Sequence, residues 1–213
     1  MVAVDIVIAD TRAAVIRNLQ DTLGTFAHQF RADRVRVHIY HGRVEDWDEQ
    51  GVCHVNPGNC AGVMRGALDR ALLALMPGVD KDVDAMVTTW GTAVAGGDRK
   101  QLPLFSALLT RSTNHRWLLT STTMIHPGPA NHRGTRNAFH ATHAALSMLT
   151  EANRAGMGIQ RVVMPGVCTG HGRMNRADAA RQMADAFRAV FCDDNIRADP
   201  TQAAHPRLMI DPQ

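Results

Sequence analysis

Two kinds of hydrophobic pattern alternate along the chain. Short apolar runs rich in β-branched residues, such as 4–9 (VDIVIA), are typical of buried strands, and strict alternation, as in 34–40 (RVRVHIY), is typical of a strand with one wetter face. Apolar residues at every third or fourth position are typical of helices. The predicted strands are 4–9, 34–40, 51–55, 84–89, 116–121 and 160–164. The predicted helices are 12–26, about 63–75, 137–152 and 177–191.

This order of elements predicts the fold class. Strands that alternate with helices form a sheet with helices packed on its faces. We therefore expect an α/β protein, a three-layer α/β/α sandwich around a mixed, largely parallel sheet. The interior has no linker rich in Gly, Ser or Pro, so we expect one domain over 1–192 and an irregular tail over 193–213. Residues 102–109 could be helix or loop.

Composition and charge are those of an ordinary globular protein. Hydrophobic residues make up 45% of the chain. The net charge of +3 is too small to indicate nucleic-acid binding by itself, so we do not expect nucleic acid as a partner. All basic residues except Lys81 and Lys100 are arginines, which can bind carboxylate or phosphate with two hydrogen bonds. GC-rich codon usage produces the same excess.

The compartment is predicted from cysteines and apolar runs. No two cysteines have C-x-x-C spacing, so we expect free thiols in a reducing compartment. The first ten residues include Asp5 and Asp10 and no basic residue, so they do not resemble a signal peptide. No apolar run approaches the roughly 18 residues of a membrane span. We expect a cytoplasmic protein without membrane contact; its oligomeric state does not follow from the sequence. The four cysteines are Cys53, Cys60, Cys168 and Cys192.

Two loops after predicted strands have the composition of an anion-binding site. They are 56–62 (NPGNCAG) and 166–174 (GVCTGHGRM). In α/β sheets, ligands bind outside the carboxyl ends of strands. Glycines let backbone N–H groups approach an anion, and the N-terminus of the following helix adds partial positive charge. Neither loop is a Walker or G-x-G-x-x-G motif, and the glycines could simply turn the chain.

Several polar residues near these loops could carry chemistry. The amide of Asn59 could orient a ribose hydroxyl, and the carboxylate of Asp69 could take a proton from water. Alternatively, Asn59 is a turn residue and Asp69 a solvated helix position. His171 could act as a general acid, because imidazole titrates near neutral pH, or it could face solvent. Asn175 is the predicted N-cap of the last helix, with Asp178 three residues on.

Taken in order, these motifs resemble the macro domain family, which binds ADP-ribose. The stretch 55–59 (VNPGN) is similar to the family's Val-Asn-x-x-Asn signature. The Pro-Gly between its two asparagines resembles the sequence found in a bacterial and phage branch of the family. The stretch 120–127 (TSTTMIHP) resembles the family's Pro-Thr-Met segment, and 164–172 (MPGVCTGHG) its second phosphate loop. The resemblance extends over roughly residues 4–191.

The resemblance implies a ligand and a reaction. The partner would be ADP-ribose or an ADP-ribosylated substrate, and the reaction would release ADP-ribose from an ester or remove its 1″-phosphate, without a metal or cofactor. Asn59 would contact the distal ribose, Asp69 would activate water, and His171 completes the catalytic candidates. A non-catalytic binding module for ADP-ribose or a related nucleotide is the alternative. The ligand-binding candidates are Asn56, Gly58, Gly62, Met64, Arg65, Gly66, Gly166, Val167, Cys168, Thr169, Gly170, Gly172 and Arg173.

The chain departs from the family pattern at two positions. The family often has Gly-Asp-Ile where this chain has 42–44 (GRV), and that Asp accepts from the adenine amine. Because a guanidinium can only donate, Glu45 or Asp10 would have to replace it. Where the family has consecutive glycines, this chain has 65–67 (RGA), which would narrow the pocket or let Arg65 pair with a phosphate.

The remaining candidates are histidines and aromatic residues. His140 and His143 are three positions apart on a helix and could chelate a metal ion, as could His126 and His132. No cysteine falls in register with them, so we expect no bound metal ion. Phe139 or Trp90 could stack on a base, although core packing is expected of both.

Overall fold

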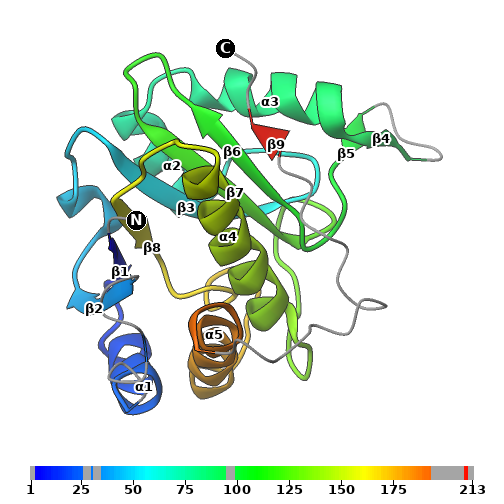
Figure 1. Ribbon diagram of the computed structural model, residues 1–213. Coiled ribbons are helices and arrows are strands. Elements are labelled where there is room, and N and C mark those ends of the chain that lie inside the picture. Colours follow the sequence, from blue (N-terminus) through cyan, green and yellow to red (C-terminus); the bar gives the residue numbers. More distant parts are fainter. Residues whose placement is uncertain (1–2, 26–29, 31–34, 95–98, 193–208, 211–213) are drawn as a thin grey trace.

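The computed structural model describes residues 3–25, 30, 35–94, 99–192 and 209–210, and its architecture confirms the predicted fold class (Figure 1). A mixed seven-stranded sheet has the strand order β2-β1-β8-β3-β7-β6-β9, in which only the β6–β7 pair is antiparallel. Its strands are β1 (Val4–Asp10), β2 (Val35–His41), β3 (Val52–Asn59), β6 (Ala107–Arg111), β7 (Trp117–Met124), β8 (Arg161–Met164) and β9 (Met209–Ile210).

Helices cover both faces of this sheet. Helices α1, α4 and α5 pack on one face, and α2 and α3 pack on the other (Figure 1). A short hairpin of β4 (Thr92–Ala93) and β5 (Lys100–Gln101) follows α3. The helices are α1 (Ala13–Leu23), the single turn η2 (Val44–Asp46), α2 (Ala67–Leu75), α3 (Val79–Trp90), α4 (Asn137–Arg154) and α5 (Arg176–Phe191).

The sheet separates two hydrophobic cores. In β1, Ile6 and Ile8 belong to the core under α1, α4 and α5, whereas Val7 belongs to the core under α2 and α3. Successive side chains of a strand point to opposite faces, so a strand between two helical layers must be apolar throughout. The continuous apolar run at the N-terminus therefore marks a central strand.

Two element predictions are wrong. Residues 84–89, predicted as a strand, lie in α3, where Val79, Val83 and Val87 are buried at four-residue spacing. The β-branched content of this short window concealed the helical period. Residues 102–109 were predicted as helix or loop. Loop is right for 102–106 and wrong for 107–109, which begin β6; so short an apolar run shows no period.

Two further predictions differ from the structure. The helix predicted from about residue 63 begins at Ala67, after its N-cap Gly66. The tail predicted to be irregular contains β9, which pairs with β6; residues 193–208 and 211–213 lie outside the described residues, as do Phe26 and Arg34. Within the described part of the chain, no helix is both long and apolar enough to cross a membrane.

Candidate ligand pocket

A pocket of 470 Å³ opens at the carboxyl ends of the central strands, within the usual size of small-molecule sites. The loops after β1, β2, β3, β7 and β8 converge there, because these parallel strands end at the same edge of the sheet. Its lining residues are Ala9, Asp10, Thr11, Arg12, Gly42, Arg43, Val44, Glu45, Asn56, Pro57, Gly66, Ala67, Leu68, Asp69, Ala71, Thr123, Met124, Pro165, Gly166, Cys168, Gly170, His171 and Gly172.

Asp69 is the carboxylate in one wall of the pocket. It occupies the first turn of α2, where its Oδ2 accepts from the backbone N–H of Gly66 at 2.6 Å. Its Oδ1 accepts from Nδ2 of Asn56, on β3, at 2.9 Å. These two bonds hold the side chain from two elements and leave further lone pairs on both oxygens for a water molecule.

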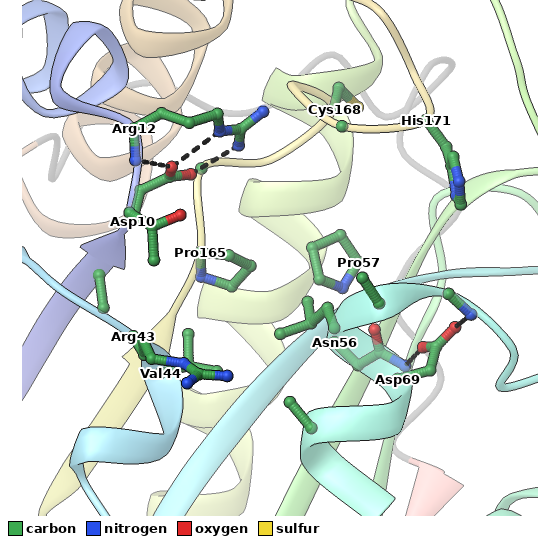
Figure 2. A pocket seen from close by; sticks show the side chains of 18 of the residues that line it. Asp10, Arg12, Arg43, Val44, Asn56, Pro57, Asp69, Pro165, Cys168 and His171 are labelled. Carbon is green, nitrogen blue, oxygen red and sulfur yellow. Dashed lines mark hydrogen bonds and ion pairs between the residues drawn. The ribbon is translucent and has the colours of Figure 1, made fainter.

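His171 lies beside Asp69 in the same wall, whereas Arg12 and Asp10 lie across the pocket (Figure 2). A β-carbon added to Gly66 would stand 3.0 Å from Oδ2 of Asp69 and 3.7 Å from Cε1 of His171. The carboxylate and the imidazole thus border one small space, which the missing side chain of Gly66 leaves open.

Arg12 joins the end of β1, where it contacts Asp10 (Figure 2), to Thr169 in the loop after β8. Its Nε and Nη2 donate to the two carboxylate oxygens of Asp10, at 2.9 and 2.7 Å. Its Nη1 and Nη2 also donate to the carbonyl and hydroxyl oxygens of Thr169, at 2.7 and 2.6 Å. A planar guanidinium with several donors suits such a four-bond contact, which fixes the position of the second loop.

The second loop is compact and close to the sheet. The hydroxyl of Thr169 donates to the carbonyl of Gly166 at 2.8 Å, and a β-carbon on Gly166 would lie 2.7 Å from Val15. Cys168 has a positive φ of 61° and is buried. Burial raises the pKa of the Cys168 thiol to about 12, so the thiol stays protonated and is unsuited to act as a nucleophile.

The loop after β2 provides a third wall. Arg43 and Glu45 form a 2.9 Å ion pair with each other, and both line the pocket. Asp46 holds this turn by accepting from the backbone N–H of Arg43 at 2.9 Å. Asp10 also lines the pocket, but both of its oxygens already accept from Arg12.

The structure brings eight of the sequence-predicted site residues to the pocket and leaves eight outside its lining. Asn59 is outside, since its amide bonds both the N–H and the carbonyl of Val63, at 3.2 and 2.8 Å. This is the turn role that was the alternative for Asn59. The eight lining residues are Asn56, Gly66, Asp69, Gly166, Cys168, Gly170, His171 and Gly172, and the others are Gly58, Asn59, Gly62, Met64, Arg65, Val167, Thr169 and Arg173.

The remaining candidates lie outside the pocket lining, and Trp90, for which core packing was expected, is instead 40% exposed at the end of α3. His132 is buried, and its Nδ1 lies 3.0 Å from the Asn137 amide. His143 stacks with Phe139, and neither Phe139 nor Trp90 lines the pocket. Among the described residues, no group of three or more His, Cys, Asp or Glu side chains could hold a metal ion. Asn175 is the N-cap of α5 and accepts from the N–H of Asp178, as predicted.

Sequence reasoning missed Arg12. The signal for it was present, because Asp10, Thr11 and Arg12 directly follow the first predicted strand. The rule that ligands bind beyond the carboxyl ends of strands applies to that strand as much as to the two with glycine-rich loops.

Comparisons with known proteins identify the fold. No protein-family model and no curated protein matches the chain. Among solved structures, the macrodomain of Mycobacterium tuberculosis DarG has a TM-score of 0.52 at 16% identity, over 72% of this chain and 90% of that one. An alphavirus P23pro-zbd structure (TM-score 0.47, 17% identity) covers 70% of this chain and 19% of that one, and a macrodomain protein from Streptomyces coelicolor (0.39, 15%) covers 65% and 78%. The chain therefore has the macrodomain fold.

Proposed function

We propose that this pocket binds ADP-ribose and hydrolyses an ADP-ribosyl ester or ADP-ribose 1″-phosphate. The observation that carries the proposal is the placement of Asp69 beside His171 in a pocket walled by two glycine-containing loops. The macrodomain fold and the resemblance of both loops to the macro domain family support ADP-ribose as the ligand. We expect no metal or cofactor to take part.

Binding would orient the ligand across the pocket. The donors available to the diphosphate are the backbone N–H groups near Gly170 and the second N–H of Arg12 Nη1, which Asp10 and Thr169 do not use. Successive N–H groups and a charged donor favour anions. The distal ribose would then lie against Asn56 and Asp69. This orientation places the reacting carbon beside the space between Asp69 and His171.

Hydrolysis needs a proton acceptor for water and a proton donor for the leaving group. Asp69 would accept a proton from water as the water oxygen attacks the electrophilic centre. His171, in its protonated form, would donate a proton to the departing oxygen. Water thus supplies the hydroxyl to one product and, through these two residues, a hydrogen to the other.

Asn59 takes a positioning role in this proposal. Since its amide bonds the backbone of Val63, it would hold the loop between β3 and α2. Asn56 is then the amide that contacts the ligand and orients Asp69.

A binding module without catalysis is the second candidate. The observation that favours it is the Arg43–Glu45 ion pair in the pocket wall, where the family often has an adenine-reading Asp. Glu45 could accept from an amine only while also paired with Arg43, so base recognition would be altered. This reading predicts nucleotide binding without turnover.

Calorimetry and an ester-cleavage assay separate these readings. ADP-ribose should bind with micromolar affinity, about −8 kcal/mol, and more tightly than AMP or ribose 5-phosphate. Asp69→Asn keeps an oxygen for the Gly66 N–H but cannot accept a proton from water, so it should bind ADP-ribose normally and lose about 100-fold or more in turnover. Asp80→Asn, an exposed acid in the first turn of α3, is the matched control. Absence of binding at millimolar ADP-ribose overturns the proposal, and binding without wild-type turnover selects the second candidate.

A further inference from the structure

A second concave surface lies next to the pocket, beyond the loop after β8. Gly172 lines the pocket, and the next residue, Arg173, lines a groove of 670 Å³. The groove also includes the first turns of α1 and α5, two helices that lie side by side (Figure 1). One loop therefore separates the two sites.

The charge of this groove is unbalanced. Arg133, Arg173 and Arg176 line it with exposed side chains, and none of the three forms an ion pair with another described residue. Asp178 is the one acidic residue among the described residues of this lining, and its Oδ1 pairs with Arg181 at 2.7 Å. Three guanidinium groups thus face solvent without a counter-charge from the described residues.

An adjoining groove of 440 Å³ has a balanced lining, in which two arginines stand against two aspartates. The two grooves share Gly134, Met174 and Asp178, and the second adds Arg136 and Arg181. The only further acid there, Asp185, lies 3.9 Å from Arg188. Across both grooves five arginines stand against two aspartates among the described residues, so the positive charge extends over more surface than a single phosphate needs.

The linings of the two grooves offer charged side chains but no exposed aromatic or large apolar side chain among the described residues. No aromatic side chain lines either groove among the residues that the structure describes, and Met174 is itself buried. Protein partners usually fill a surface pocket with aromatic or large apolar side chains, whereas a nucleic-acid backbone is bound through its phosphates. Arginines are suited to phosphate because their planar donors bind two oxygens at once.

We propose that these two grooves bind the sugar-phosphate backbone of a nucleic acid. The whole-chain net charge of +3 conceals this surface, because acidic residues elsewhere cancel the arginines gathered here. The inference is independent of the proposed function, since it concerns different residues. If both hold, the strand would run along the rim of the pocket.

The test is the fluorescence anisotropy of a labelled single-stranded DNA, and of an RNA of the same sequence, titrated with the full chain. Binding should weaken as salt rises from about 50 to about 200 mM, because each phosphate contact releases counterions. The double variant Arg133→Ala/Arg176→Ala should bind at least tenfold more weakly and show a shallower salt dependence, by about 0.7 in log–log slope for each arginine lost. Arg154→Ala, an exposed arginine at the other end of α4, should bind as the wild type does.

Three outcomes overturn the proposal. They are no binding of either strand at low salt, equal binding by the double variant and the wild type, and equal competition by a polyglutamate of the same charge, which would indicate an acidic protein partner. ADP-ribose calorimetry on the same double variant keeps the two proposals distinguishable. A variant that loses the strand and keeps ADP-ribose separates the grooves from the pocket.

Discussion

The side-chain amide of Asn56 donates a 2.9 Å hydrogen bond to Oδ1 of Asp69, and thereby joins β3 to the first turn of α2 inside the pocket. Replacing Asn56 with Asp would set a second carboxylate against Asp69. Two adjacent carboxylates resist simultaneous ionisation, so the acid limb of the kcat/KM profile for ester cleavage should move to higher pH by about one unit or more.

Asn56→Ala is the control for this prediction. It removes the amide without adding charge, so it should lower turnover and move the acid limb to higher pH by less than Asn56→Asp does, because only a hydrogen bond to the carboxylate is lost. A pH profile that is the same for Asn56→Asp and the wild type would show that Asp69 is not the titrating base.

Gly66 keeps the space between Asp69 and His171 open. Its φ is −70°, which any residue can adopt, so Gly66→Ala should fold normally. The added β-carbon would stand 3.0 Å from Oδ2 of Asp69, in the position proposed for the attacking water. We expect about a tenfold loss in kcat with an unchanged melting temperature.

Gly170→Ala is the matched change for Gly66→Ala, because a β-carbon there meets no atom within 4 Å. It leaves the space between Asp69 and His171 open, so kcat should stay near the wild-type value, and any effect should be on the Kd for ADP-ribose, whose diphosphate we place near this residue. Wild-type kcat in Gly66→Ala would mean that water does not occupy this space.

The contact between Arg12 and Thr169 should control ligand affinity. Lysine is a point charge and cannot reproduce the four donor contacts of Arg12, so Arg12→Lys should loosen the second loop and raise the Kd for ADP-ribose about tenfold. Thr169→Val should have a similar effect. The double variant should lose less binding free energy for ADP-ribose than the sum of the losses in the two single variants, because each single variant already breaks the same contact.

Calorimetry measures all three Kd values. Arg17→Lys, at an exposed position on α1, the helix whose N-cap is Arg12, controls for the change of arginine to lysine and should bind as the wild type does. Full additivity in the double variant would show that the two residues do not act through each other.

Local sequence predicted most strands, most helices and both loops. Glycines, strand-like runs and a following helix are neighbours in sequence, so the loops after β3 and β8 could be recognised directly. Arg12 and Thr169 are 157 residues apart, and their contact depends on β1 and β8 being neighbours in the sheet. No local pattern contains that pairing.

The choice between Asn56 and Asn59 shows a second limit. Both belong to one motif, three residues apart, and strand geometry places such residues on opposite sides. In addition, the pairing of β3 with β7 shifts register between Gly58 and Asn59, so the alternation of side chains along β3 is interrupted there. The sequence indicates both asparagines as candidates, but the pleat of β3 determines which of their amides faces the pocket.

His54 should make the protein sensitive to acid. It is fully buried in β3, and burial lowers its pKa to about 4, from an ordinary value near 6.5. Between these values the unfolded chain binds a proton that the folded chain does not. The free energy of unfolding should therefore fall as the pH drops from about 6.5 to about 4, by up to about 3 kcal/mol from this residue.

Urea unfolding of the wild type and of His54→Leu across this pH range measures the effect. The variant should be less stable or equally stable at pH 7, since its side chain differs in shape, but its stability should fall less steeply with acid. His126→Leu is the control and should keep the wild-type slope, because this position is exposed and the substitution leaves His54 unchanged. If His54→Leu loses stability with acid as steeply as the wild type does, another buried group carries the acid response.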